Sequence, residues 1–532
     1  MAEASPQIDQ NYWQSLVIEE GDLEALSAFL LEVETPLSPQ ELAEQLIQQR
    51  LSAIAAEEAA QAASAAVAYI PKERYENGQR ISFETLDDRV GEVVGVRKAD
   101  TLNGAEFEVI EVRFEGGDTA EFAAGLEAHA LNEVEVDEVD EGFDPVQEIL
   151  QSHSKGIVEV LEAALRKNED FVYIAGQWFP TALTAEFSEG QLNVAEALLD
   201  VAQGGPLATE EILKEVGLPD GVNPKLASFS LDLALQEDER FDEVGTTGVV
   251  AWFLRRLEPN DVQHTPLFLR YEEREHDRAS LTDEMLDLEL RLHDELSPID
   301  DQEDEEVEQV EVRLIFPHWR SGSLPLTNSM SKLFPTAYES PRVRFEFVDE
   351  QSGERYPGWV VRNERYVDGL RKWYTEHGLM PGSYVKARRG EQPGEIIVWT
   401  DAHHSSKEWV RTALIGADGG VVYAMLKQTV ESAFDERMMI YMPSDIEALN
   451  ASWEKARPKL EPVVLHAIRE LTKLSPQQHA HVSEIYAAVN VVMRCPPAPI
   501  MALLAAHADI SHVGHLHFRL NTDSEDLEDI QA

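Results

Sequence analysis

The chain has little cysteine and little positive charge. It contains one cysteine, Cys495, and 44 Lys and Arg against 100 Asp and Glu among its 532 residues. One cysteine can neither form an internal disulfide nor supply a thiolate metal cage, which excludes disulfide scaffolds and zinc ribbons and fits a reducing compartment. The formal charge of −56 repels phosphate backbones as a whole. Any contact with nucleic acid therefore has to be local, and a protein partner is expected to be basic.

Long apolar runs are absent as well. No run approaches the roughly 20 residues needed to cross a bilayer, and residues 1–13 have neither the basic start nor the apolar core of a secretion signal. We therefore expect a cytoplasmic protein without a membrane partner.

The common catalytic motifs are also missing. The sequence has no Gly-rich phosphate cradle, no dinucleotide-binding turn and no nucleophile elbow. His515 and His517 would share one face of a strand, but no nearby carboxylate or thiolate completes a metal site. We expect no enzyme activity, cofactor, metal or small-molecule substrate. A nuclease-like site hidden among the many carboxylates stays open as an alternative.

What is present is enough apolar sequence, 43%, for several packed cores. A length of 532 residues predicts about three to five domains. Helical and strand patterns alternate in blocks, which predicts an α+β multidomain protein. Residues 75–126 have short runs of period two separated by Gly, Asp and Asn, which is typical of a small SH3-like β-barrel of about five strands. The acidic run that follows, from Glu133 to Asp144, is expected to be a linker.

One phrase recurs three times along the chain: an apolar helix, a short polar break and a second helix. The middle copy continues with a third helix that has Pro224 at its first position, and then with two extended runs about a Gly-Thr-Thr-Gly turn. Three helices and a hairpin make a winged helix, a helix-turn-helix variant. We predict two full winged helices and a truncated one at the start of the chain. The three copies are 23–47, 194–216 and 464–489.

The winged-helix modules resemble those of transcription and restriction proteins, including the HARE type carried by an acidic RNA polymerase subunit. The third helix of such a module normally reads DNA. In the middle copy that helix offers Lys225 alone and is followed at once by acidic residues, with Arg255 and Arg256 the local exception. We therefore interpret the middle copy as a protein-contact module.

The composition changes between residues 316 and 414. This stretch holds 14 Lys or Arg and 12 Asp or Glu, a balance of +2 that leaves −58 for the rest of the chain. Basic and aromatic side chains are interleaved in it, so arginine can meet phosphate while an aromatic ring packs or stacks. This is where a nucleic-acid surface is expected.

The order of a strand, a Gly-Leu-x-x-Trp-Tyr helix, a Gly-Leu-x-Pro-Gly turn and another strand, from Gly369 to Gly382, resembles the B-three class of DNA-binding pseudobarrel domains. This class is best known from plant transcription factors and is related to the recognition domains of some restriction enzymes. The resemblance covers about a hundred residues, and Ser383 stands where that family usually has an acidic residue.

In that family two loop arms of the barrel enter the major groove, where arginine reads guanine edges or anchors phosphates. Matched residue by residue, the resemblance implies that the first arm is His318, Trp319, Arg320 and Ser321. It implies that the second arm is Arg355, Tyr356, Trp359, Arg362 and Arg365. The alternative is that Trp359 is part of the core and that the arginines balance local carboxylates.

The predicted function is that of a non-catalytic, DNA-associated protein in transcription or DNA-processing control. Residues 315–412 would contact DNA, and the acidic winged helices would contact proteins. The alternative is an acidic interaction scaffold that binds a basic partner such as RNA polymerase without touching DNA. The predicted domains are a degenerate winged helix (10–70), a small β-barrel (71–132), an acidic linker (133–146), a winged helix (147–260), an acidic linker (261–312), a pseudobarrel (313–412), a connecting α/β segment (413–460), a winged helix (461–520) and an acidic tail (521–532).

Overall fold

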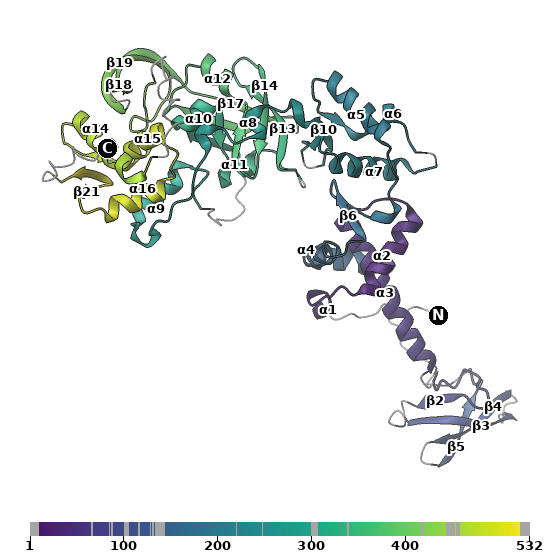
Figure 1. The fold of residues 1–532 in the computed structure, drawn as a ribbon. Coiled ribbons are helices and arrows are strands. Elements are labelled where there is room, and N and C mark those ends of the chain that lie inside the picture. The colour runs from purple at the N-terminus through teal and green to yellow at the C-terminus, as the bar shows by residue number, and fades with distance from the viewer. Residues whose placement is uncertain are drawn as a thin grey trace. The chain divides into compact units, whose positions relative to one another are not determined.

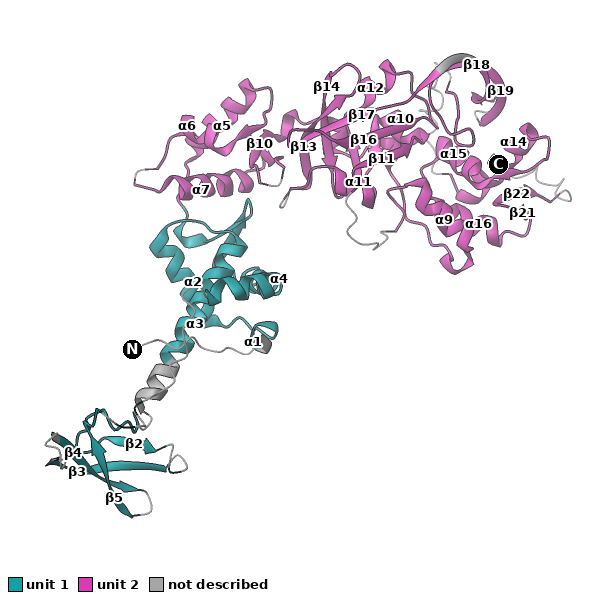
Figure 2. Ribbon diagram, turned by 180° about the vertical axis from the view of Figure 1, so that it is seen from behind, with its two compact units in different colours: residues 1–184 teal, residues 185–532 magenta. Residues whose placement is uncertain are grey.

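The protein is a mixed α+β chain that divides into two compact units, residues 1–184 and 185–532 (Figures 1 and 2). Of the expected linker 133–146 and tail 521–532, residues 133–143 and 522–532 lie outside the residues that the structure describes, and the linker's last two residues belong to a helix that begins at Pro145. The computed structural model describes residues 10–64, 67–83, 86, 89–100, 106–114, 117–127, 129, 132, 144–219, 221–246, 248–298, 307–337, 340–416, 420–442, 453 and 458–521.

Unit 1 contains a three-helix module that is split in the sequence, which we call repeat 1. Leu37, in the break between its first two helices, exchanges both backbone hydrogen bonds with Trp178 in the second strand of its hairpin, with N–O distances of 3.2 and 2.8 Å. The short first helix α1 (Gln10–Gln14) packs against α4. The elements of repeat 1 are α2 (Glu20–Val33), α3 (Pro39–Ser64), α4 (Pro145–Leu165), β6 (Phe171–Ile174) and β7 (Gln177–Pro180), followed by the turn η3 (Thr181–Leu183).

The start of α3 follows the sequence closely. The Ser38 hydroxyl accepts from the Glu41 N–H, and the Glu41 carboxylate accepts from the Ser38 N–H, so a capping box satisfies both donors ahead of Pro39. The helix then continues through Arg50, because no glycine or proline interrupts it there. The Ala-rich run from Leu51, which the sequence alone suggests is a separate helix, therefore continues α3, and one helix covers 39–64.

A five-stranded sheet is inserted between α3 and α4 of repeat 1. Its strands follow the sequence order, and all neighbours are antiparallel except the first pair. Tyr75, Phe83 and Phe114 form its buried aromatic core with Ile110. The strands are β1 (Val67–Ala68), β2 (Arg80–Phe83), β3 (Arg89–Asp100), β4 (Glu106–Phe114) and β5 (Thr119–Ala124). Because this insertion separates α4 and the hairpin from α2 and α3, the consecutive sequence pattern predicted a truncated module.

Unit 2 begins with the same arrangement in uninterrupted form, which we call repeat 2. Its last strand is the middle strand of a three-stranded sheet and pairs Trp252 with Leu207, as Trp178 pairs with Leu37. The sequence suggests Thr209 as the N-cap of the second helix, but Thr209 is the first residue of that helix and its hydroxyl donates to buried Asp232. The elements are α5 (Glu189–Val201), β8 (Leu207–Ala208), α6 (Thr209–Val216), α7 (Pro224–Glu237), β9 (Phe241–Glu243) and β10 (Ala251–Leu254).

The segment 261–298, expected to be part of an acidic linker, is folded. Leu281, Met285, Leu288 and Leu292 recur every three or four residues and are buried together in the largest core of unit 2. The high carboxylate count of this segment hid its apolar stripe. Its elements, with the short helical turns that precede them, are η4 (Arg255–Leu257), α8 (Asn260–Gln263), η5 (Leu267–Leu269), η6 (Arg278–Ser280) and α9 (Asp283–Leu292).

A nearly closed seven-stranded sheet follows, in the order β11-β16-β17-β13-β14-β15-β12. All its neighbours are antiparallel except β13 and β17, which are parallel. Phe345, Phe347, Trp373 and Tyr374 are buried inside it. Its elements are β11 (Gln309–Arg313), α10 (Phe316–Ser321), β12 (Ser323–Pro325), α11 (Asn328–Leu333), β13 (Arg342–Asp349), β14 (Arg355–Val361), β15 (Tyr366–Asp368), α12 (Arg371–Glu376), β16 (Tyr384–Arg389) and β17 (Glu395–Trp399).

A long two-stranded ribbon and a third module, repeat 3, complete unit 2. The ribbon crosses the boundary expected at residue 412, because its first strand runs without interruption from Ala402 to Ile415. Phe518 in the last strand pairs with Ala480, as Trp178 and Trp252 pair in repeats 1 and 2. The elements are β18 (Ala402–Ile415), β19 (Val421–Ser432), α14 (Leu460–Leu474), β20 (Ala480–His481), α15 (Val482–Val492), α16 (Pro497–Ala506), β21 (Ile510–Gly514) and β22 (His517–Leu520).

No single helix among the described residues has the length and apolar character needed to cross a membrane, although α15 and α16 together, bent by 118°, meet that measure.

Candidate nucleic-acid interface

The first proposed arm is a short helix rather than an open loop. His318, Trp319, Arg320 and Ser321 lie on α10, between β11 and β12. The helix ends at Gly322, whose φ of +76° and whose close approach to the Arg371 backbone leave no room for a Cβ atom. These four side chains therefore have fixed positions.

Most of the first arm points inward. His318 is buried, with its Nδ1 2.9 Å from the Ser323 hydroxyl and its Nε2 2.9 Å from a Glu295 carboxylate oxygen. Trp319 donates its indole N–H to the Leu379 carbonyl at 2.6 Å. Ser321 is buried. The Arg320 guanidinium lies over the Phe268 ring, and its burial, together with nearby Arg371, lowers its pKa. This arm offers little to an incoming phosphate.

The second proposed arm consists of β14 and the tight turn into β15. Tyr356 and Trp359 are buried, the former with its hydroxyl donating to Glu376 and the latter edge-on to Phe253. The pKa of the Tyr356 hydroxyl is raised, mainly by burial and also by the neighbouring Glu376. These two aromatic side chains serve packing, which agrees with the alternative interpretation of the sequence.

The arginines of the second arm bind other parts of unit 2. Arg355 is exposed and forms ion pairs with Glu346 and Glu395. Arg362 is also exposed and donates to the Ser340 and Ala337 carbonyls at 3.0 and 3.3 Å. Arg365 donates to the Ser297 carbonyl at 3.3 Å. Arg355 and Arg362 stand at opposite ends of β14, about 20 Å apart along the strand, so they do not form one basic patch.

Repeat 2 covers the side of the sheet that carries the second arm. Phe253 and Val244 pack against Trp359 and Tyr366 in one buried cluster. Arg342, on the neighbouring strand β13, forms ion pairs with two buried carboxylates of this module: Asp242 at 2.7 Å and Glu258 at 3.5 Å. Burial and, to a smaller extent, the neighbouring Asp242 together raise the pKa of Glu258 to about 8.

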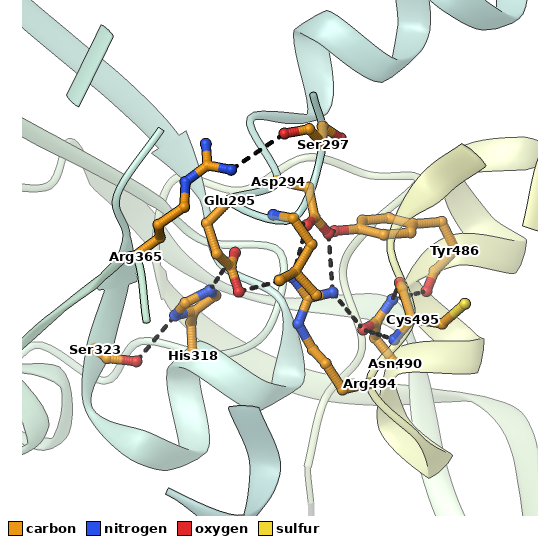
Figure 3. Close-up of polar contacts among 11 residues, drawn as sticks. Asp294, Glu295, Ser297, His318, Ser323, Arg365, Tyr486, Asn490, Arg494 and Cys495 are labelled. Atoms are coloured by element: carbon orange, nitrogen blue, oxygen red, sulfur yellow. Dashed lines mark hydrogen bonds and ion pairs between the residues drawn. The ribbon is translucent and has the colours of Figure 1, made fainter. Parts of the chain in front are cut away.

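A buried ionic cluster joins α10 to repeat 3 and accounts for His318 (Figure 3). Arg494 is fully buried and binds Asp294 through both terminal nitrogens, at 2.9 and 2.7 Å, and Glu295 at 2.8 Å. Tyr486 donates to Asp294 at 2.5 Å. Burial alone would raise the pKa of Glu295, but Arg494 and His318 outweigh it and hold that pKa below its usual range. We call these five residues the ionic junction.

The ionic junction combines a histidine, two carboxylates, a tyrosine and an arginine, but its geometry favours a structural role. The side chains of Arg494 and Asp294 are 0% exposed, and those of Glu295 and His318 are 3% and 2% exposed, so a substrate cannot reach them. Among the described residues no group of His, Cys, Asp and Glu is arranged to hold a metal ion. The sequence alone does not reveal this cluster, because Asp294 and Glu295 lie in a carboxylate-rich segment that is expected to be a solvated linker. A lone arginine between the apolar runs of α15 and α16 was the available signal.

The third helices of the repeats, which would read DNA in a winged helix, differ in exposure. In α7 the exposed charges are Lys225 and Glu237, and most of the helix is buried. The helix α16 carries no charged residue and packs against α9 and η6. The helix α4 has an exposed face, but Glu148, Glu159 and Glu162 against Lys155 give it a charge of −2. None of these three helices offers the basic face that phosphate binding requires.

Comparison with known proteins finds no family model, no curated protein and no solved structure that matches the chain.

Proposed function

We propose that the protein is a non-catalytic interaction scaffold whose acidic modules bind a basic protein partner, and that the two arms do not contact DNA. The main support for this proposal is that side chains of both arms contact other parts of unit 2. His318 and Arg365 contact Glu295 and Ser297, while Trp359 packs on repeat 2. A net charge of −56 supports a partner of opposite sign.

Three modules of the same design support a scaffold. Each has a helix, a short paired segment, two more helices and a hairpin, and we interpret all three as winged helices similar to the HARE type. Their third helices are acidic, covered or without charge, which favours protein contact over major-groove reading. The inserted sheet of residues 67–127 is interpreted as a small SH3-like barrel, a fold that also suits peptide binding.

A second candidate function is contact with DNA through the seven-stranded sheet, in transcription or DNA-processing control. It is favoured by one observation: the strand β15, the short helix α12, the turn that ends at Gly382 and the strand β16 follow one another in the order by which the sequence resembles the B-three-type pseudobarrels. A helix, α10, lies between β11 and β12, where the first loop arm was expected. The exposed Arg355 and Arg362 would then be the arm residues left to meet phosphate.

Binding of the full chain to two partners separates these functions. Fluorescence anisotropy is measured with a labelled 20-base-pair duplex and with a labelled lysine-rich protein, from low salt to about 0.5 M, where charge interactions are strongly screened. The scaffold proposal expects binding to the basic protein that falls with salt, and no binding to the duplex. Duplex binding whose salt slope decreases in an Arg355→Ala/Arg362→Ala variant would instead establish the second candidate.

A further inference from the structure

One face of the β18–β19 ribbon extends beyond the module that covers it. Ala413 and Tyr423 pair across the ribbon on this face and are buried in the core of repeat 3, where the Tyr423 hydroxyl donates to the Ala488 carbonyl at 3.1 Å. The next pairs on the same face are Arg411 with Met425 and Trp409 with Lys427. Met425 is 39% exposed and Trp409 is 62% exposed. On this face the side chains of Met425 and Trp409 thus remain partly exposed beyond the core of repeat 3, beside those of Arg411 and Lys427.

A groove of about 520 Å³ lies between this face and repeat 3. This volume is within the roughly 300–1,000 Å³ of pockets that bury a drug-sized molecule, so the groove has room for a large side chain. Met425 and Trp409 form one wall, and Leu471 and Leu474 at the end of α14 form the other. The remaining lining residues are Glu408, Val410, Arg411, Phe434, Glu436, Met439, Ser475, Gln477, His479, Glu484 and His517.

The charged side chains that line the groove differ in whether they already form hydrogen bonds or ion pairs. Arg411 is engaged: it binds Glu484 at 2.5 Å and donates to the Arg437 and Met439 carbonyls. Glu436 is exposed and has no hydrogen bond or ion pair to another described residue. The ring of Trp409 already lies against a cation, Lys427, at 5.5 Å. The groove therefore combines apolar and aromatic side chains with charged ones, and among the described residues Glu436 is a carboxylate to which no cation is bound.

We propose that this groove docks a segment of a basic partner protein that carries a large apolar side chain flanked by Lys or Arg. The apolar side chain packs between Trp409, Met425 and Leu474, and the cation reaches Glu436. An acidic segment would meet Glu408 and Glu436 and is disfavoured. Exposed tryptophan beside a pocket is the side chain that most often dominates a protein interface. This inference rests on the proposed scaffold function and identifies its partner surface.

The test uses the full chain and three labelled twelve-residue peptides: one with alternating Leu and Lys, one with Glu replacing Lys, and one with Ser replacing Leu. Fluorescence anisotropy is compared among the native chain, Trp409→Ala, Glu436→Lys and the control Val513→Ser. Val513 is 48% exposed on repeat 3 but does not line the groove. All three substituted side chains are at the surface, so circular dichroism should show the same fold in each protein.

Trp409→Ala and Glu436→Lys should each weaken binding of the Leu-Lys peptide at least about fivefold, while Val513→Ser leaves it unchanged. The peptide with Ser replacing Leu should bind native and Trp409→Ala chains equally. Equal binding of the Leu-Lys peptide to all variants, or equal binding of the Glu peptide, overturns the inference. So does a dimer of the native chain that Trp409→Ala dissociates, because the occupant is then a second copy. If the full chain binds the lysine-rich protein and these variants do not change peptide binding, the docking site is wrong and the scaffold function stands.

Discussion

Leu37 and Trp178 exchange two backbone hydrogen bonds although the whole inserted sheet, residues 67–127, lies between them in the sequence. Trp252 and Phe518 hold the matching positions in repeats 2 and 3, and all three aromatic side chains are 2% exposed or less. This pairing closes each repeat: it joins the hairpin to the break between the first two helices. It also makes repeat 1 one module despite its interruption.

Trp178→Ala should destabilise unit 1 and leave unit 2 unaffected. Removing a buried tryptophan costs about 3–5 kcal/mol. Differential scanning calorimetry should show the unfolding transition of unit 1 at a lower temperature. Val17→Ala, at a position that is 70% exposed, is the control and should shift neither transition. A large shift of the unit 2 transition would show that the closure of repeat 1 is not local.

Arg494→Met should destabilise unit 2 by about 3–5 kcal/mol, because Asp294 and Glu295 would remain buried without their cation. The matched variant Arg494→Met/Asp294→Asn/Glu295→Gln removes both charges with the arginine and should recover much of that loss. Urea unfolding monitored by tryptophan fluorescence measures both variants. Equal stability of the two would mean that the charges do not determine the stability of the ionic junction.

Asp232 makes the stability of repeat 2 depend on pH. Burial raises its pKa to about 7 from the usual 3.8, against the opposing hydrogen bonds from Thr209 and Trp252. A carboxyl whose pKa is raised by folding stabilises the fold fully below pH 4, and this contribution is lost as the pH rises through 7. The Thr209 hydroxyl and the Trp252 indole N–H both donate to Oδ1 of Asp232, so Asp232→Asn keeps this acceptor and removes the charge.

Asp232→Asn should therefore raise the free energy of unfolding at pH 8 by on the order of 2 kcal/mol and leave it nearly unchanged at pH 4. Urea unfolding at the two pH values measures the difference. Comparing variant with native chain cancels the change in overall charge repulsion, which also favours low pH in so acidic a protein. The opposite pH dependence would show that Asp232 is ionised and stabilising in the fold.

Gly322→Ala should disturb the first arm. The added Cβ would lie 2.7 Å from backbone atoms of Arg371, at a φ of +76° that alanine rarely adopts. We expect a loss of about 2–4 kcal/mol, the sum of left-handed strain and overpacking. Gly353→Ala is the matched control, since its φ is +70° and nothing lies within 4 Å of the new Cβ. It should cost about 1 kcal/mol, and equal losses would contradict the packing argument.

The sequence predicted the helical modules well where the signals are local. Pro224, expected at the first position of a helix, is the first residue of α7, and Pro39 likewise begins α3. Alternating apolar residues likewise predicted the strands of the inserted sheet. These features depend on capping residues and on apolar periodicity within a few residues, and both can be recognised directly in the sequence.

What the sequence could not provide depends on contacts between distant segments. Arg494 neutralises Asp294 from 200 residues away, so charge counting treated Asp294 as part of a solvated linker. The resemblance implies arm positions for Trp359 and Arg365, but Trp359 packs edge-on to Phe253 and Arg365 donates to the Ser297 carbonyl. The sequence carries no local signal for the accessibility of these side chains, because accessibility depends on the segments packed around the seven-stranded sheet.

The closure between Leu37 and Trp178 also has a mechanical consequence. A pulling force applied to the two ends of the chain would be transmitted through the Leu37–Trp178 pairing and the α3–α4 contact. The inserted sheet lies outside this path, so it would carry no tension until repeat 1 had opened. Unfolding under force should then occur in two steps: repeat 1 opens first, and the inserted sheet unfolds only afterwards.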